Sequence, residues 1–446
     1  MTRRFSRGVG SIALCLVAGA WIALPASADQ PFPARLEGRA ILPAASFIAP
    51  PPDAGDWYAI SGRFMRGGRV DAPESRGRPG ELPWPFRGQP IQGLSGVAIA
   101  ADGDLLAIAD NGFGARANSQ DALLGLHRLR PNWADGSVAV VESVFLADPN
   151  GIARFPTIGD PTATRYLTGS DFDPESLARI GDRLFVGEEF GPYVMEIDRA
   201  GRLVDLHEAA LDGAPLRSID HPALRAAYRE PSTPHRVPRS GGFEALAATP
   251  DGARLWAFLE KPLRADPEDA APEGGEAPFV RILEFDVAAA RWTGRGVKHR
   301  LADGAAAIGG ADMIGPRTAL VIERDWGQGD PARACPDQQR SLACFPRPAR
   351  VKRVSLIDWA EPDADGFARV IGHIDLMDIA APDGGRFTFP FVTVEAVARV
   401  DEARILVMND NNLPGSRGRA PDRPDDTEII LLNASEMLAA GDRRAY

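Results

Sequence analysis

The chain has 446 residues, with 61 acidic against 50 basic side chains and a formal net charge of −11 at pH 7. An acidic surface repels nucleic acid and anionic lipid, so we expect no nucleic-acid partner and favour solubility or cation binding. The length exceeds what one compact core usually holds, which favours several domains or a fold built from repeats.

The N-terminus has the pattern of a signal peptide over residues 1–28. Arg3 and Arg4 precede an apolar run over residues 12–24, and a small-residue stretch ends at Ala28. That order predicts cleavage after Ala28, and the arginine pair leaves twin-arginine export open. The apolar run is too short for a membrane span, so we expect a periplasmic or secreted chain with one domain over residues 29–446.

Five segments along the chain resemble one another. Each has a short strand with a polar or acidic second residue, a tight turn, a second apolar strand and a polar cluster; they begin at Leu94, Pro174, Phe243, Ala311 and Val394. Asp-Gly between apolar runs, as at Asp102 and Asp251, is a strong hairpin signal. A third apolar strand follows most segments, so each unit has the antiparallel strands of a propeller blade. We therefore predict an all-β fold, a β-propeller.

The spacing of these segments is longer than the repeat of about 40 to 50 residues in regular propellers, which predicts inserted loops. Candidate loops, rich in Pro, Gly and charge and expected after the second strands at one end of the propeller, are 147–170, 206–240, 264–277, 326–348 and 414–426. Strand-like stretches near Ala34 and Trp57 fall outside the five repeats. Because a strand from one terminus often completes the last blade, we expect six blades closed by the termini, with five as the alternative. Long helices are expected to be scarce, with the best candidates near His221 and Ala434.

Two cysteines, Cys335 and Cys344, remain after removal of the leader. In an oxidising compartment, this short spacing favours one local disulfide in a surface loop, and a metal pair is the minor alternative.

The second residue of the first strand is the most informative repeated position. First strands line the channel of a propeller, and the residues at this position are Ser95, Glu175, Glu244, Asp312 and Glu395. A ring of carboxylates is costly unless a cation neutralises it, and oxygen ligands suit calcium or another hard divalent ion. We therefore predict a calcium site whose ligands are Glu175, Glu244, Asp312, Glu395 and Asp410. Alternatively, each acid holds neighbouring blades together through backbone amides.

Polar clusters end the second strands and should lie at the rim where the first strands begin. From these clusters, from the inner ring and from one loop, we expect Glu244, Glu395, Glu189 and Asp325 as catalytic residues and Lys261, Arg324, Arg239 and Asn411 as ligands of a small anionic or ester substrate. A cation would activate water, and a carboxylate would serve as its base. The alternative for each rim cluster is an ordinary Asx-turn.

Six short motifs in a fixed order give the chain a resemblance to a known family. They are LSGVA from Leu94, DPESLA from Asp173, EEFGPY from Glu188, GFEALA from Gly242, ERD from Glu323 and MNDNN from Met408. Over about Leu94 to Asn433 the chain resembles the phytase-like family called "esterase-like activity of phytase". The resemblance implies an exported β-propeller that hydrolyses phosphate or other esters. The motif positions that it carries over are Glu175, Glu188, Glu189, Glu244, Glu323, Asp325, Glu395, Asp410 and Asn411.

The sequence therefore favours an exported, metal-dependent hydrolase of phosphate or other esters. The motifs of calcium-dependent β-propeller phytases and a surplus of basic residues are not found, so phytate is not the expected substrate. The alternatives are a calcium-dependent lactonase-like enzyme and a non-catalytic propeller that binds a ligand or partner.

Overall fold

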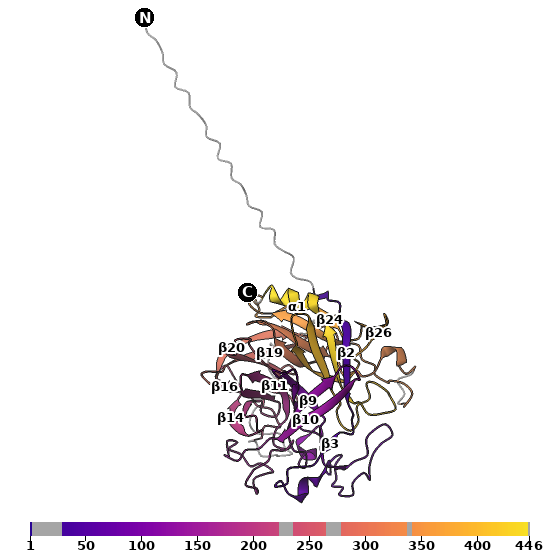
Figure 1. Cartoon of the computed structure of the whole chain (residues 1–446). Helices are drawn as coiled ribbons and strands as arrows, with labels where there is room; N and C mark the ends of the chain where they lie inside the picture. The colour runs from indigo at the N-terminus through magenta and orange to yellow at the C-terminus, as the bar shows by residue number, and fades with distance from the viewer. Residues whose placement is uncertain (2–28, 223–234, 265–277, 337–340, 445–446) are drawn as a thin grey trace.

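The computed structural model describes Met1 and residues 29–222, 235–264, 278–336 and 341–444. The expected signal peptide and most of the expected helix after His221 lie outside these residues. In the described part the regular elements are nearly all strands, and the only α-helix is α1 (Ser435–Asp442), which confirms the helix expected near Ala434 (Figure 1). None of the described helices has the length and apolar character needed to cross a membrane.

Five groups of four strands make up the blades, and each strand in a group pairs with the next. The first blade is β7 (Leu94–Ile99), β8 (Leu105–Ala109), β9 (Gly125–Asn132) and β10 (Ser137–Phe145). The second is β11 (Pro174–Ile180), β12 (Arg183–Glu188), β13 (Tyr193–Ile197) and β14 (Leu203–Glu208). The third is β17 (Phe243–Ala248), β18 (Arg254–Leu259), β19 (Phe279–Asp286) and β20 (Arg291–Arg300).

The fourth blade is β21 (Ala307–Met313), β22 (Thr318–Arg324), β23 (Lys352–Asp358) and β24 (Arg369–Asp375), with β1 (Gln30–Pro31) added at its outer edge. The fifth is β27 (Thr393–Arg399), β28 (Arg404–Asp410), β29 (Thr427–Asn433) and β2 (Arg35–Leu42). The remaining short elements are η1 (Asp56–Ala59), η2 (Arg116–Asn118), η3 (Pro331–Arg333), β3 (Phe47–Ile48), β4 (Ile60–Ser61), β5 (Phe86–Arg87), β6 (Gln89–Pro90), β15 (Ala210–Leu211), β16 (Ala214–Pro215), β25 (Ile379–Ala380) and β26 (Arg386–Phe387).

The inner strands close a ring. Strand β7 contacts β11, and the contacts continue through β17 and β21 to β27, which contacts β7 again. The chain is therefore a β-propeller, as predicted, and its described residues form five blades rather than the six that we expected. The stretch near Trp57 was expected to help build a sixth blade, but it forms η1 and the two-residue strand β4 outside the blades.

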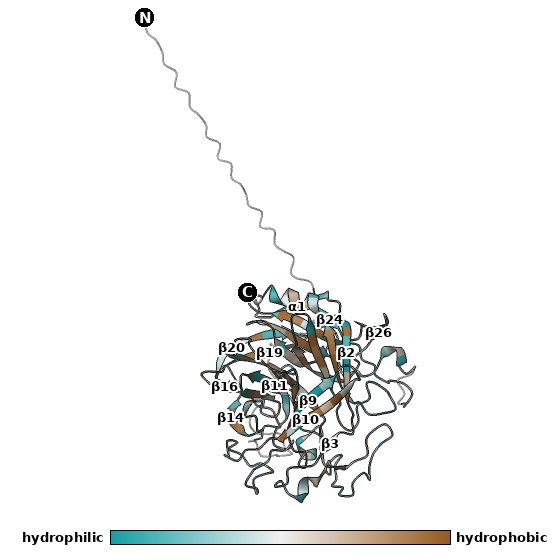
Figure 2. Ribbon diagram, in the orientation of Figure 1, coloured by the Kyte–Doolittle hydropathy of each residue, from teal (hydrophilic) through white to brown (hydrophobic). Residues whose placement is uncertain are grey.

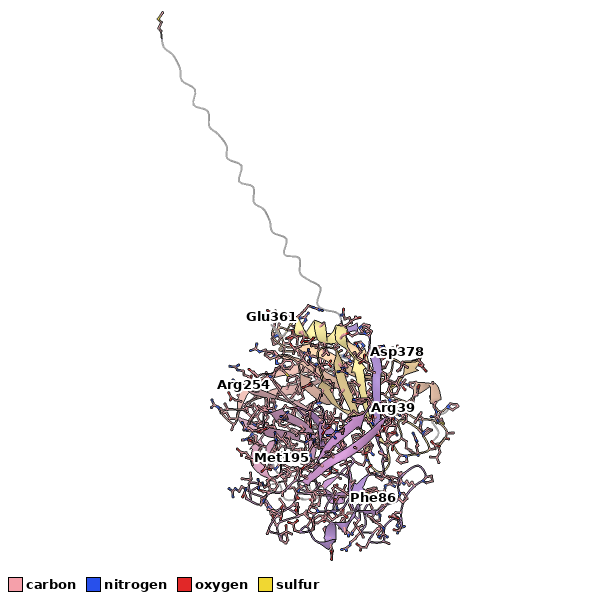
Figure 3. The ribbon with its side chains drawn as sticks, viewed as in Figure 1. Arg39, Phe86, Met195, Arg254, Glu361 and Asp378 are labelled. Carbon is pink, nitrogen blue, oxygen red and sulfur yellow. A yellow bond between two sulfur atoms is a disulfide. The ribbon has the colours of Figure 1, made fainter. Side chains whose placement is uncertain are left out.

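An N-terminal strand completes the last blade, as predicted for the stretch near Ala34. Strand β2 pairs antiparallel with β29, so the indigo start of the chain lies beside yellow C-terminal strands (Figure 1). Arg39, labelled in Figure 3, donates from Nε to Oε2 of Glu428 at 2.7 Å. Glu428 is almost fully buried and also accepts from Arg419. The pairing covers the free edge of β29.

Hydrophobic side chains fill the spaces between adjacent blades. Many strand residues are hydrophobic and are coloured brown in Figure 2. Because successive side chains of a strand point to opposite faces of the sheet, hydrophobic residues lie on both faces of a blade. Between the third and fourth blades, for example, Trp256 meets Trp359 edge to face with ring centroids 5.1 Å apart. Each blade is thus buried against its neighbours and depends on ring closure.

Long loops and an N-terminal segment cover one mouth of the channel; we call this layer the crown. The antiparallel order brings both the loops after second strands and the loops between blades to the mouth where inner strands begin. The loops at 326–348 and 414–426 follow second strands as expected, whereas 147–170 and 206–240 follow the outermost strands of their blades, and 265–277 lies outside the described residues. Residues 43–93 also join the crown, where Phe86 stacks on Phe113 with centroids 6.0 Å apart. The expected disulfide, Cys335–Cys344, closes one crown loop.

A buried charge on β2 tests whether this strand is needed to close the ring. Ala40 on β2 is fully buried, so Ala40→Asp should lower the melting temperature by several degrees, because burying a carboxylate costs several kcal/mol. Ala139→Asp, an exposed alanine on outer strand β10, is the matched control and should change it little. Equal effects in thermal unfolding followed by circular dichroism would contradict this role of β2.

Candidate functional site

Each inner strand contains one β-bulge near its start. The residue that follows Leu94, Pro174, Phe243, Ile308 or Val394 has no partner on the second strand, and these extra residues are Ser95, Glu175, Glu244, Gly309 and Glu395. A bulge redirects the side chain of its extra residue. The structure therefore places four of the five predicted channel residues at one equivalent position in their blades.

The fourth blade departs from the prediction, because its bulge residue is Gly309 and not Asp312. A Cβ atom at Gly309 would lie 1.9 Å from the carbonyl oxygen of Val394, so the neighbouring blade leaves no room for a side chain. Glycine has no polar side chain that could mark the position in the sequence, so the prediction gave the position to Asp312, three residues later. Asp312 instead lies toward the far end of β21, where its Oδ2 accepts from the amide of Arg399 at 2.7 Å.

Asp312 therefore does not belong with the other predicted cation ligands. It lines a cavity of about 380 Å³ with Arg179 and Arg399 at the opposite mouth, and burial raises its pKa to about 6. Between the two mouths the channel narrows to a space of about 10 Å³ beside Leu177 and Leu246, about enough for one water molecule.

A second set of equivalent residues follows the second strands. In each blade, the residue before the bulge pairs with a residue near the end of the second strand. The residues that come directly after these five partners are Asp110, Glu189, Glu260, Arg324 and Asp410. Asp110 and Glu260 belong to the polar clusters expected at the rim, but they were given no catalytic, metal or substrate role, although they occupy the same position as Glu189 and Asp410. Asp173, two residues before Glu175, was given no such role either.

These two sets form an acidic bowl, which we define as Asp110, Asp173, Glu175, Glu189, Glu244, Glu260, Glu395 and Asp410. All are buried except Asp110, which is half-buried. Two groups of three have carboxylate oxygens within 4.8 Å of one another: Asp173, Glu175 and Glu189, and Glu189, Glu244 and Glu260. Each group could hold a metal ion, and Glu189 belongs to both. Of the predicted ligands, Glu175 and Glu244 thus lie in such groups.

The other two predicted ligands in the bowl have different partners. Glu395 accepts from the Ser95 hydroxyl at 3.0 Å, and its Oε1 lies 3.6 Å from Nη2 of Arg324. Asp410 accepts from the amide of Asn412 at 2.7 Å. Both line the bowl without joining either group of three.

Burial and mutual repulsion make ionisation of the bowl costly. Burial, followed by the charges of neighbouring acids, raises the pKa of Asp110, Glu175, Glu189 and Glu244 well above their usual range. The same causes raise the pKa of Glu395 to about 8, and burial raises that of Asp410 to about 6. The bowl is therefore stable only with bound protons or with cations.

Arg324 is the basic member of the second set. Its Nη2 donates to Glu260 at 3.0 Å and to Glu244 at 3.3 Å. Within the described structure its Nε and Nη1 are buried without a hydrogen-bond partner, which leaves two donors unsatisfied. Its guanidinium lies 4.7 Å from the ring centroid of Trp326, and Nζ of Lys261 lies 5.2 Å from the same ring. Two of the three basic residues predicted to bind substrate, Arg324 and Lys261, thus meet at one indole beside the bowl.

Two acids carried over from the family motifs serve the framework instead. Glu188 accepts from the amides of Asp173, Phe190 and Gly191 at 3.1, 2.8 and 2.8 Å. Glu323 accepts from Arg353 Nε at 2.7 Å and lies 3.2 Å from Nε2 of His299.

The pKa of Glu323 shows how tightly the framework holds it. Burial alone would raise this pKa, but the hydrogen bond and charge of His299, with Arg353, lower it to about 2. Glu323 therefore stays ionised between blades.

Three further predicted residues have defined partners outside the bowl. Asp325 lies 3.0 Å from Nζ of Lys352, and Asn411 accepts from the amide of Gly93 at 3.4 Å and donates to the carbonyl of Asp425 at 3.1 Å. Arg239 is exposed and pairs with Asp220 at 2.5 Å. These contacts give the three residues roles in holding crown loops, whether or not they also meet a substrate.

Comparison with known proteins identifies one family. The family described as "Phytase-like: Esterase-like activity of phytase" matches residues 89–413. No curated protein matches the sequence significantly.

Solved structures resemble the chain only distantly. Glutaminyl cyclase of Myxococcus xanthus is 12% identical with a TM-score of 0.34, covering 77% of this chain and 91% of that chain. Periplasmic gluconolactonase of Pseudomonas aeruginosa is 14% identical with a TM-score of 0.32, covering 84% and 98%. The Dos1 propeller is 9% identical with a TM-score of 0.30, covering 79% and 69%. Likeness at this level carries no argument about activity.

We predict opposite stability effects for two adjacent glutamates, measured with a chelator present. Glu188→Gln should lower the melting temperature, because both carboxyl oxygens of Glu188 accept from backbone amides and the NH2 group of glutamine would face one of these donors. Glu189→Gln should raise it, because it removes an acid whose raised pKa makes ionisation unfavourable in the fold.

The stability gained by Glu189→Gln should depend on pH. When folding raises the pKa of an acid, the folded protein loses stability as the pH rises above the pKa of that acid in the unfolded chain. The gain in stability from Glu189→Gln should therefore be larger at pH 8 than at pH 5. Calorimetry that found both variants equally destabilised at both pH values would contradict the assignment.

Proposed function

The chain belongs to the phytase-like family, and from this and from the acidic bowl we propose that it is a cation-dependent hydrolase of phosphate or other esters. The observation that carries the proposal is the pair of buried carboxylate groups that share Glu189 beside Arg324. A purely structural core gains nothing from so many close acids, because their mutual repulsion destabilises the fold.

The donor set of the bowl fits a hard divalent cation. All ligands in the two groups are carboxylates, which suit calcium or magnesium and not a soft metal. Asp173, Glu175 and Glu189 would hold one ion, and Glu244 and Glu260 with the shared Glu189 could hold another; we propose calcium. When bound, such a cation would polarise the ester and lower the pKa of water.

Arg324 and Lys261 favour an anionic substrate. A phosphate or carboxylate approaching the bowl meets the unsatisfied donors of Arg324 and the ammonium of Lys261 at the face of Trp326. Because a neutral lactone needs neither basic side chain, Arg324 and Lys261 favour an anionic ester over a lactone as the substrate.

Glu395 is the carboxyl best placed for proton transfer. It lies outside both groups of three, and the Ser95 hydroxyl orients it. Burial and the neighbouring acids raise the pKa of Glu395, which favours its protonated form as a donor to the oxygen of the leaving group. Glu189 and Glu244 then serve mainly to hold the cation, and Asp325 to position Lys352.

We also propose that the protein is exported to the periplasm or secreted. The Cys335–Cys344 disulfide supports this location, because structural disulfides persist mainly in oxidising compartments. The leader expected over residues 1–28 would direct the chain there.

We predict that Glu244→Gln and Glu395→Gln keep the fold and abolish hydrolysis of bis(p-nitrophenyl) phosphate and p-nitrophenyl acetate. Asp312→Asn, at the opposite mouth, is the control and should retain activity. Absorbance of released nitrophenolate measures the rate, and circular dichroism checks folding. Full activity in both glutamate variants would overturn the catalytic proposal, and lost folding would favour a purely structural role for these acids.

We further predict that calcium raises the melting temperature of chelator-treated protein. A cation that binds only the folded state adds about 2.7 kcal/mol at one hundred times its dissociation constant. Glu189→Gln should remove most of this response, and Asp312→Asn should keep it. If neither calcium nor magnesium changes the melting temperature of the wild type, the proposal of a cation site in the bowl is wrong.

A further inference from the structure

A pocket of about 330 Å³ lies in the crown, outside the acidic bowl. It forms between the loop that follows β22 and the loop that follows β28, so two adjacent blades contribute to it. Its lining includes Trp326, Gln328, Phe345, Arg347, Arg417 and Pro421.

The walls of this pocket are fixed to one another. The side-chain oxygen of Gln328 accepts from the amide of Arg417 at 3.0 Å, and the amide of Gln328 donates to the carbonyl of Arg347 at 2.8 Å. The Cys335–Cys344 disulfide closes the first loop, and Phe345 packs against Gly329. The backbone that carries both arginines is therefore held in place before any ligand arrives.

The charge of the pocket differs from that of the whole chain. None of the lining residues that the structure describes is acidic, and neither Arg347 nor Arg417 makes an ion pair with another described residue. One guanidinium nitrogen of Arg417 lies 3.5 Å from the carbonyl of Pro79 and 3.4 Å from that of Pro421, which orients the group without neutralising it. Two uncompensated arginines on a protein with a net charge of −11 mark a site for an anion.

One side chain is shared by this pocket and by the basic residues beside the acidic bowl. Trp326 lines the pocket, and its ring is the one that Arg324 and Lys261 approach to 4.7 and 5.2 Å. Phe345 and Pro421 add apolar surface to the wall. A molecule that reached both places would need an anionic group at each end and a flat or apolar body to lie along the indole.

We propose that the pocket binds a second, non-reacting anionic group of the substrate, so that the natural substrate is an organic ester with two anionic groups on an apolar body. This inference rests on the proposed function of the bowl. Arg347 and Arg417 act as specificity residues, and bidentate contacts of arginine with phosphate or carboxylate account for the selectivity.

Binding of inert probes tests this inference separately from catalysis. Calorimetry with calcium present would compare phenylphosphonate with benzene-1,4-bisphosphonate, neither of which is hydrolysed. The bisphosphonate should bind the wild type about tenfold more tightly, and the R347Q/R417Q double variant should lose this advantage while its affinity for phenylphosphonate stays unchanged. Arg333→Gln, on the same loop but against Phe345 rather than in the pocket lining, is the control and should keep the advantage.

Three outcomes would overturn the inference: equal affinities of the wild type for the two probes, an advantage that survives in the double variant, or no binding of either probe. The first two leave the proposed function standing, because activity toward mono-anionic esters and its loss in Glu244→Gln are measured independently. For a bis-anionic ester, the double variant should raise KM about tenfold with kcat unchanged, since the arginines contact a part of the substrate that does not react.

Discussion

Mutual repulsion among buried carboxylates is the constraint on which the architecture of this propeller depends. The acidic bowl brings Glu189 within reach of four other acids, at positions where water screens little of their charge. Such an arrangement persists only when the surrounding structure is stable enough to impose it. The closed ring of five inner strands supplies that stability, because a residue at a bulge cannot move outward without displacing a neighbouring blade.

Closure and charge compensation work at different places in the ring. Strand β2 completes the fifth blade and, through Arg39 and Glu428, ties the start of the chain to its end. Arg324 occupies the one rim position that is not acidic and contacts three glutamates of the bowl. On the inner strand of the same blade, Gly309 is the one bulge position without a side chain, so the fourth blade adds a positive charge to the bowl and no inner-strand carboxylate.

The sequence predicted the repeated unit well and the ring less well. Apolar strands with Asp-Gly turns were enough to identify a propeller, and the acidic pattern identified Glu175, Glu244 and Glu395. The predictions of six blades and of Asp312 in the channel were wrong for a common reason. Each depended on a segment whose sequence does not show where it lies in the fold. The stretch near Trp57 has strand-like composition but packs in the crown, and Gly309 carries no side chain to align.

Which acid faces the bowl depends on the pleat of the second strand, and the sequence alone does not reveal its phase. Glu188 and Glu189 are adjacent and chemically identical, yet successive side chains of a strand point to opposite sides. Glu188 therefore satisfies three backbone amides while Glu189 joins both carboxylate groups. Glu323 and Arg324 repeat this division in the fourth blade, with the first residue between blades and the second in the bowl. Once the bulge fixes the phase of one blade, the equivalent positions of the others follow, and the rim acids Asp110 and Glu260 could then have been given the same role as Glu189.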